Sequence, residues 1–445
     1  MSRADCASLL LVLAVAAGAM RSQTPPAPIP TMNPASQPAD AVMTLTQIEA
    51  IALANQPRLL AAQLRSRASS QRIRESRSAL YPSLAFNATG VRVADTGTAT
   101  AAGAITTSSL SDRFAYGGNL VQMVTDFGRT SALIGSSRSL AAAQKDEAVF
   151  TGADIRLNVR EIYFQVMGAE AVLRAAREAQ SNRQTISRQI GALAESQLRS
   201  TLDVNFANVL ESEAELAVLR AESAVAQQRS RLASAIGQTQ PVTATLAAEA
   251  LPSPLPPDAT TFLAQAQAQR ADLNAALSRQ RAADEFASAE KRLSYPTLNI
   301  AGTAGQIPYH DHTLQDNYAA IGFNLNIPLL NGGLFAARRS EAELEARARA
   351  EDVKEQKLEV NQQVREKWYQ ANEAFRSLDV SARLVAQSRE ALRLAQARYE
   401  AGLGSIVELN EAQLSETSAE ITAATANYDY LSRRAELDYA AGLLN

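Results

Sequence analysis

The side chains with the clearest metal-binding chemistry are His310, Asp311 and His312, which include both histidines of the chain. Two imidazole groups at alternate positions, with a carboxylate between them, can ligate a transition metal. A stable site, however, also needs a further ligand and a shell of supporting hydrogen bonds. The surrounding sequence is typical of a loop between two strands. We therefore interpret the cluster as an exposed polar loop, keep metal binding as the less favoured alternative, and expect no cofactor.

Catalytic groups do not gather anywhere else in the sequence. No nucleophile, general base and orienting group occur together, and no glycine-rich loop suited to phosphate is present. The net charge is −3, with acidic and basic residues interleaved, so no basic face for nucleic acid is indicated. The single cysteine, Cys6, precedes an apolar run and leaves no disulfide in a processed chain. The sequence predicts neither an enzyme nor a nucleic-acid-binding protein.

The N-terminal residues have the pattern of a secretory signal. Arg3 precedes the apolar residues 9–20, a run shorter than the roughly 20 residues that a transmembrane helix needs. We predict a signal peptide over residues 1–22. Residues 23–42 are rich in Pro, Ala, Ser and Thr, so we expect a disordered leader there.

The rest of the chain is duplicated. Residues 159–165 read almost like 364–370, and the strand start 81–84 returns at 295–298. Gly128 returns as Gly332 after a similar run. We predict a first repeat over 43–240, a proline-rich linker over 241–257 and a second repeat over 258–445, each holding a helix, two strands and a long helical hairpin.

Two kinds of periodicity mark the strands and the first helix. Residues 298–304 and 318–329 alternate apolar with polar or small side chains, and 82–93 and 113–127 do so more weakly. On alternation alone a half-buried soluble hairpin is the favoured interpretation, although a barrel strand between lipid and water has the same pattern. Thr44, with Gln47 three positions later, predicts a helix start, and Pro57 an interruption.

The proline-free segments 128–195 and 333–400 predict two long helices, each on the order of 100 Å at about 1.5 Å per residue. Their apolar positions step by three and four, which is typical of a coiled-coil seam. The positions are Ile155, Val159, Ile162, Val166, Ala169, Leu173 and Ala176, then Phe375, Leu378, Ala382, Val385 and Leu392. Because a membrane barrel needs about eight strands, four strands would close one only if several chains combined them.

Residues 398–413 resemble the helix-tip signature of TolC-type outer-membrane efflux proteins. The segments 81–84, 295–298 and 327–333 resemble the same family, and the resemblance extends from about 43 to 445. It reverses the preference for a soluble hairpin. It implies an α+β membrane protein in which each chain gives four transmembrane β-strands to a trimeric 12-stranded barrel. The long coiled-coil helices would form a periplasmic α-helical tunnel.

The same resemblance implies an outer-membrane channel of a tripartite efflux or secretion system. Such a channel passively conducts substrates from an inner-membrane pump and its adaptor across the periplasm and the outer membrane. The implied partners are two further copies in a homotrimer, a periplasmic adaptor (membrane fusion) protein, an inner-membrane transporter and outer-membrane lipid. The alternative is a soluble periplasmic coiled-coil adaptor or scaffold protein.

Residue roles follow from the resemblance at the helix tips. Glu408 and Glu411 match acidic positions that face the pore, where rings of carboxylates favour cations; the alternative is that both are solvated helix residues. Tyr399 and Asp203 match positions that hold the tunnel closed. The usual basic partner is replaced by Gly404, so Arg199 becomes the gate candidate that would supply the charge, although it is more simply a solvated turn residue.

The docking tip for the adaptor is implied at both helical turns. Gly402 and Leu403 match it in the second repeat, and Gln197 and Leu198 in the first. Gln197 departs from the family pattern, which has glycine at this position. A glycine is favoured where a helix ends in a left-handed residue.

Overall fold

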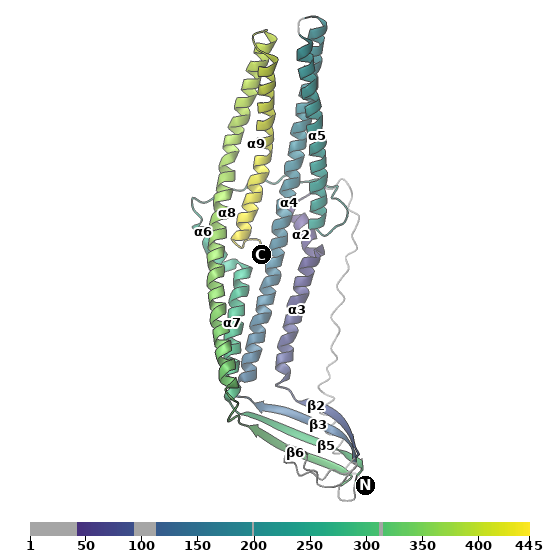
Figure 1. Ribbon diagram of the computed structural model, residues 1–445, viewed down its shortest axis with the longest axis vertical. Coiled ribbons are helices and arrows are strands. Elements are labelled where there is room, and N and C mark those ends of the chain that lie inside the picture. Colours follow the sequence, from purple (N-terminus) through teal and green to yellow (C-terminus); the bar gives the residue numbers. More distant parts are fainter. Residues whose placement is uncertain (1–41, 93–112, 198–199, 311–314) are drawn as a thin grey trace. The chain divides into compact units, whose positions relative to one another are not determined.

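The computed structural model describes residues 42–92, 113–197, 200–310 and 315–445 (Figure 1). These residues belong to one compact unit, Val42–Asn445. The predicted signal peptide and the leader up to residue 41 lie outside the described residues, as do Leu198, Arg199, Asp311 and His312. Val42, predicted as the last leader residue, begins strand β1 (Val42–Met43).

The same order of elements occurs twice along the chain. The first set is α2 (Leu45–Asn55), α3 (Pro57–Ser78), β2 (Ser83–Val91), β3 (Arg113–Thr125), α4 (Arg129–Glu195) and α5 (Thr201–Ala235). The second set is α6 (Thr260–Gln269), α7 (Ala271–Lys291), the 3₁₀ turn η1 (Arg292–Ser294), β5 (Thr297–Tyr309), β6 (Asn317–Asn326), α8 (Leu334–Glu400) and α9 (Ile406–Ala440). A two-residue strand, β4 (Thr245–Leu246), lies between them.

The long hairpins of the two sets have equal lengths. Helices α4 and α8 each have 67 residues, and α5 and α9 each have 35. Equivalent residues of the hairpins are therefore 205 positions apart: α4 begins at residue 129 and α8 at 334, and α5 begins at 201 and α9 at 406. By this alignment Gly128 is equivalent to Gly333, and the earlier match of Gly128 to Gly332 was wrong by one residue. Phe127, with φ 52°, has the left-handed conformation that Gly332 adopts with φ 61°.

The first helix starts as predicted. Thr44 and Gln47 form a reciprocal capping box, and Pro57 begins α3 after a break at Gln56. In each set the last helix of the hairpin ends beside the junction of the first two helices. The Gln56 side chain, between α2 and α3, donates to the Ala235 carbonyl at the end of α5 at 2.9 Å. The Arg270 side chain, between α6 and α7, donates to the Ala440 carbonyl at the end of α9 at 3.2 Å. These contacts satisfy carbonyls that a helix end would otherwise leave without a donor.

The four long strands form one antiparallel sheet in the order β2-β3-β5-β6. Paired residues point to the same side of a sheet, so the register defines its two faces. One face is mainly apolar: Leu84, Phe86, Leu120, Leu298, Ile300, Ile321, Phe323 and Leu325. The other is polar or small: Asn87, Asn119, Asn299, Thr303, Gly305, Asn324 and Gly322. Ile321 and Phe323 are 84% and 78% exposed, so nothing in the described part of the chain covers this end of the apolar face.

Two predicted strand boundaries were wrong. The strand predicted over 318–329 ends at Asn326, because Pro328 has no amide hydrogen for a ladder bond. The strand predicted over 298–304 continues to Tyr309. Pro308 is tolerated there because it lies beyond the last pair of β5 with β6, Gln306 with Asn317, and within the register shift of β5 against β3.

The helices contact one another in a defined order. Helix α4 pairs with α5, α8 pairs with α9, and α4 contacts α9, which gives the row α5–α4–α9–α8. Nearer the sheet, contacts of α3 with α4, α4 with α7 and α7 with α8 give the row α3–α4–α7–α8. Figure 1 shows the two long hairpins with their tips at the same end. In the described part of the chain, no helix combines the length and the hydropathy needed to cross a membrane.

The predicted coiled-coil period is present in α8, with two positions wrong by one residue. Ala374 and Ser381 are buried, whereas the predicted Phe375 is half-buried and Ala382 is exposed. The other predicted positions, Leu378, Val385 and Leu392, are half-buried. Seven of the buried residues of α8 lie at intervals of seven or fourteen: Ala346, Val353, Val360, then Ala374, Ser381, Ser388 and Ala395. Most of these side chains are small, which lets neighbouring helices approach closely but buries little apolar surface per turn.

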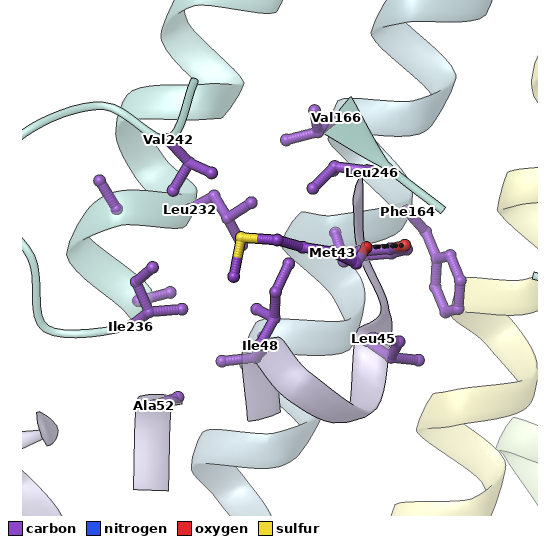
Figure 2. Packing of buried hydrophobic residues seen from close by; sticks show 14 of the residues in the cluster. Met43, Leu45, Ile48, Ala52, Phe164, Val166, Leu232, Ile236, Val242 and Leu246 are labelled. Carbon is purple, nitrogen blue, oxygen red and sulfur yellow. Dashed lines mark hydrogen bonds between the residues drawn. The ribbon is translucent and has the colours of Figure 1, made fainter. Parts of the chain in front are cut away.

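The largest apolar cluster joins the start of the first set to the predicted linker (Figure 2). Met43 and Ile48 pack with Leu232 and Ile236 at the end of α5. Leu246 of β4 completes the cluster, because β1 and β4 pair in parallel. Residues 241–257 therefore contribute to the core through their first part.

Gly237 is expected to tolerate no side chain. Its φ is 75°, and a Cβ atom would lie 2.9 Å from the Asn55 carbonyl oxygen. We expect Gly237→Ala to lower the thermal unfolding midpoint, measured by helical circular dichroism, by an amount equivalent to about 1–2 kcal/mol or more. Gly191→Ala in α4 is the control, since a Cβ there meets nothing within 4 Å. It should raise the midpoint by about 0.5–1 kcal/mol equivalent; equal effects would contradict this account.

Candidate functional site

The second helical tip, between α8 and α9, is a well-formed turn. Gly402 has φ 72°, and its amide donates to the Tyr399 carbonyl at 3.0 Å. The Leu403 amide donates to the Arg398 carbonyl at 2.8 Å, which completes a Schellman motif. The Leu403 side chain is exposed. The predicted docking tip thus presents an apolar side chain on a turn fixed by backbone hydrogen bonds.

The first tip, between α4 and α5, begins with the same left-handed turn but with a different residue. Gln197 is equivalent to Gly402 and adopts φ 58°, a left-handed conformation that is costly for a residue with a Cβ atom. Its amide donates to the Ala194 carbonyl at 2.9 Å. Ser200 caps the following helix by accepting from the Leu202 amide. Leu198 and Arg199, predicted as tip and gate residues, lie outside the described residues.

The two predicted pore carboxylates differ in their surroundings. Glu408 lies in the first turn of α9, where its amide donates to the Ser405 hydroxyl at 3.1 Å. Its carboxylate pairs with Arg398, with 3.1 Å between Oε1 and Nε. Glu411 is exposed one turn later, and no ion pair to it is present among the described residues. Glu411 therefore carries the less compensated negative charge.

Tyr399 and Asp203 come into contact across the two hairpins, with the Tyr399 hydroxyl 3.5 Å from Asp203 Oδ2. This distance is at the outer limit of a hydrogen bond. The Tyr399 ring is buried in a small apolar cluster that links α4, α5, α8 and α9: Ile190, Ala207, Ile406 and Leu409. Packing therefore contributes more than the hydroxyl contact to holding the tips together.

Gly404 stands where the family resemblance implies a basic residue. A Cβ atom there would lie 3.2 Å from the Tyr399 amide nitrogen and 3.3 Å from Glu408 Oε2. The turn is thus tightly packed around a glycine. Arg398 already supplies a positive charge beside Glu408.

A buried charge between the hairpins was missed by the sequence reading. Arg183 of α4 is buried and donates from Nη1 to Oε1 of Gln413 on α9 at 2.9 Å. It follows Ala176 and precedes Ile190 at intervals of seven, so it occupies a core position of the helical seam. Gln413 Nε2 is buried without a partner among the described residues. An arginine at a heptad core position was the signal available in the sequence.

The electrostatics of this contact are unfavourable. Burial lowers the pKa of Arg183, which Glu213 and Glu416 partly offset. Burial raises the pKa of Glu416, and the neighbouring Glu420 raises it further. Arg389 binds Glu420 at 2.7 Å on the exposed side. A buried guanidinium whose hydrogen-bond partner is a neutral amide is weakly compensated.

The predicted metal cluster is only partly described. His310 Nε2 lies 2.9 Å from Asp316 Oδ1. Asp311 and His312 lie outside the described residues, and within those residues no group of three or more metal-ligating side chains occurs. Metal binding at this loop stays a weak alternative.

Comparison with known proteins gives consistent matches. The family model described as outer membrane efflux protein matches residues 50–238 and 262–443. Outer membrane protein TolC of Salmonella enteritidis is 25% identical over 312 residues, which cover 65% of this chain and 61% of that protein. The aligned part thus spans less than two thirds of this relative's length.

Solved structures share the fold at low sequence identity. The outer-membrane channel OprN superposes with a TM-score of 0.77 at 20% identity, covering 89% of each chain. CusC, whose structures are described in terms of transmembrane channel formation, superposes with a TM-score of 0.78 at 18% identity, covering 94% of this chain and 98% of its own. These likenesses establish the fold.

The contact between Arg183 and Gln413 makes a specific prediction for the seam of α4 and α9. Gln413→Leu removes the acceptor of a buried charge, so it should destabilise the protein by about 1–3 kcal/mol. Arg183→Met combined with Gln413→Leu removes charge and amide together and should be at least as stable as the unaltered protein. Thermal unfolding and amide hydrogen exchange in α4 and α9 measure both. A double variant less stable than the single one would refute the assignment of an unfavourable buried charge.

Proposed function

Since the chain belongs to the outer membrane efflux protein family, we propose that it is the outer-membrane channel of a tripartite efflux or secretion system. The family predicted from the tip and strand motifs is confirmed by the match over residues 50–238 and 262–443. The family is one of channels, and we propose that this chain has no catalytic activity. Its role is to conduct substrates passively, so their identity is set by the pump behind it.

The main support for this proposal is the four-stranded sheet. Its strands have an uncovered apolar face, an opposite face of Asn, Thr and Gly, and two edge strands, β2 and β6, without a further neighbour in the described sheet. An exposed apolar face is costly in water, and open strand edges are costly in lipid. Both costs disappear when three copies pair β6 with β2 of the next copy around a 12-stranded barrel. The polar face then lines a water-filled pore.

The helices support the same arrangement. Away from the tips, where Tyr399 contacts Asp203, the row α5–α4–α9–α8 has α5 and α8 at its ends, so a ring of copies would close a helical tunnel in the periplasm. The turns at Gly402 and Gln197 would then meet a periplasmic adaptor protein, which connects the channel to an inner-membrane transporter. The exposed Leu403 offers an apolar contact for that adaptor.

The carboxylates near the second tip would set ion preference. Three copies of Glu411 would form a ring of fixed negative charge, which repels anions and concentrates cations in a narrow pore. Glu408 contributes less, because Arg398 neutralises it within the same chain. Tyr399 and Asp203 would hold neighbouring hairpins together in the closed state, mainly through the buried Tyr399 ring.

Membrane fractionation tests the proposal against a soluble periplasmic adaptor or scaffold. A soluble protein of that kind would have to cover the apolar face of its sheet. We expect the full chain in the outer-membrane fraction, released only by detergent, and with the mass of three copies in detergent. Recovery from the periplasm as a soluble species without detergent would rule out the channel.

Ion selectivity in planar bilayers tests the carboxylate ring. Glu411→Ala should reduce the cation preference markedly. Glu408→Ala should reduce it as well, because it removes a negative charge and leaves the positive charge of Arg398 without its partner. Glu408→Ala with Glu411→Ala should reduce the preference at least as much as Glu411→Ala alone.

The control for this experiment removes the same charge far from the tip. Glu355→Ala changes an exposed acid in the first third of α8, so it should leave the ion preference nearly unchanged. Unchanged selectivity in the double variant would show that neither carboxylate faces the pore.

A further inference from the structure

A cavity of about 700 Å³ lies where α9 ends beside the start of α7. Helices α4 and α8 both contact α7 and α9, so they form walls on the two sides of this junction. The Arg270 side chain lines the cavity and bridges the junction through its hydrogen bond to the Ala440 carbonyl. Small-molecule sites in proteins have volumes of about 300–1,000 Å³. The cavity therefore has the size of a ligand site, and all four helices around it belong to one chain.

One part of the cavity wall is apolar and aromatic. Phe150 and Leu157 of α4 line it together with Tyr439 of α9, and all three side chains are half-buried. The ring centroids of Phe150 and Tyr439 lie 5.9 Å apart. Burial raises the pKa of Tyr439 to about 12, so this ring is neutral near pH 7. The wall can thus contact the apolar body of a ligand.

The rest of the wall is charged, with one carboxylate in excess. The lining has four acidic and three basic side chains: Glu147, Glu161, Asp272 and Glu436, and Arg270, Arg279 and Lys367. Arg270 pairs with Asp272 at 2.7 Å, and Lys367 pairs with Glu436 at 2.7 Å. Arg279 pairs with Glu147. Each basic side chain of the wall therefore already has an acidic partner, and Glu161 is the acid that remains.

Glu161 of α4 is half-buried, and no ion pair or hydrogen bond to its carboxylate is present among the described residues. The cations that act on it are Lys367 and Arg433. Both bind Glu436, and Arg433 also lies 3.6 Å from Asp429. Burial raises the pKa of Glu161, Glu436 raises it further, and the two cations offset this only in part. The negative charge of Glu161 is therefore incompletely compensated.

We propose that this cavity binds an organic cation, with the ammonium group paired to Glu161 and an apolar ring placed against Phe150 and Tyr439. An ammonium group donates charge-assisted hydrogen bonds to a carboxylate, which would give Glu161 the partner that the chain does not supply. The faces of aromatic rings also attract cations. The site lies within one chain, so this inference does not rest on the proposed channel.

The apolar wall is not a product of the duplication. The residues equivalent to Phe150, Leu157 and Tyr439 at the offset of 205 are Glu355, Gln362 and Ser234. The residue equivalent to Glu161 is Glu366 of α8, which is exposed and accepts a hydrogen bond from Gln370 Nε2 at 3.1 Å. The acid recurs in the other set, but the aromatic wall and the missing partner do not. The combination of an aromatic wall with an unpaired carboxylate thus belongs to this junction.

The experiment uses the full chain in detergent and naphthylmethylammonium as the probe, with binding measured by equilibrium dialysis against empty micelles. The matched probe is naphthylmethanol, which has the same ring and no charge. We expect the ammonium to bind about ten-fold more tightly than the alcohol, because only the ammonium pairs with Glu161. Equal affinity of the two probes, or no binding of the ammonium beyond that of empty micelles, would overturn the proposal.

Variants locate the binding in the cavity. Glu161→Gln keeps the size of the side chain and removes its charge, so it should weaken ammonium binding about ten-fold and leave alcohol binding unchanged. The matched control is Glu366→Gln, which removes the same charge at the equivalent position outside the cavity and should leave both probes unchanged. Phe150→Ala removes part of the aromatic wall and should weaken both probes. Helical circular dichroism checks that each variant is folded.

The outcomes separate this inference from the proposed function. Full ammonium binding in Glu161→Gln, or an equal loss in Glu366→Gln, overturns the site and leaves the channel proposal standing. If Glu161→Gln does not fold, Phe150→Ala decides: unchanged affinity of both probes in that variant overturns the site. Recovery of the chain from the periplasm without detergent would rule out the channel and leave the binding result as it is.

Discussion

The structure depends on helical seams in which small side chains are buried at intervals of seven residues. In α8 the buried positions include Ala346, Val353, Ala374 and Ser381. Small residues let two helices of 67 residues approach closely along their length, but each turn buries little apolar surface. The free energy of folding must therefore come from many small contributions along the full length of several seams.

The two sets of elements have the same helical pattern along these seams, and their sequences differ where the hairpins turn. Asp203 and Glu408 are equivalent residues in the first turns of α5 and α9. Asp203 contacts Tyr399 of the other hairpin, whereas Glu408 pairs with Arg398 of its own. Gln197 likewise takes the left-handed position that Gly402 occupies. The framework of the hairpins is symmetric, and the contacts at the tips are not.

Arg183 is a buried charge that destabilises the seam between α4 and α9. Burial lowers its pKa, and its hydrogen-bond partner Gln413 is neutral. The rest of the seam near the tips is held by a small cluster around Ile190 and Tyr399. A weakly compensated charge in a thinly packed seam makes the separation of the two hairpins easier than continuous apolar packing would.

The sequence by itself determined the duplication, the long hairpins and the strand pairs, because helical periodicity, proline positions and turn residues act locally. The family came from the resemblance of the tip and strand motifs. The sequence also placed Tyr399 and Asp203 in the same site, but only through the resemblance. Two predicted seam residues of α8, Phe375 and Ala382, lie one position from the buried residues Ala374 and Ser381, since the pattern does not say which neighbour a helix faces. Only the tertiary structure decided that Glu408 is paired with Arg398, that Arg183 is buried, and that the end helices are α5 and α8. Those facts depend on which helices meet, and contacts between residues some 200 positions apart are fixed by packing and not by local pattern.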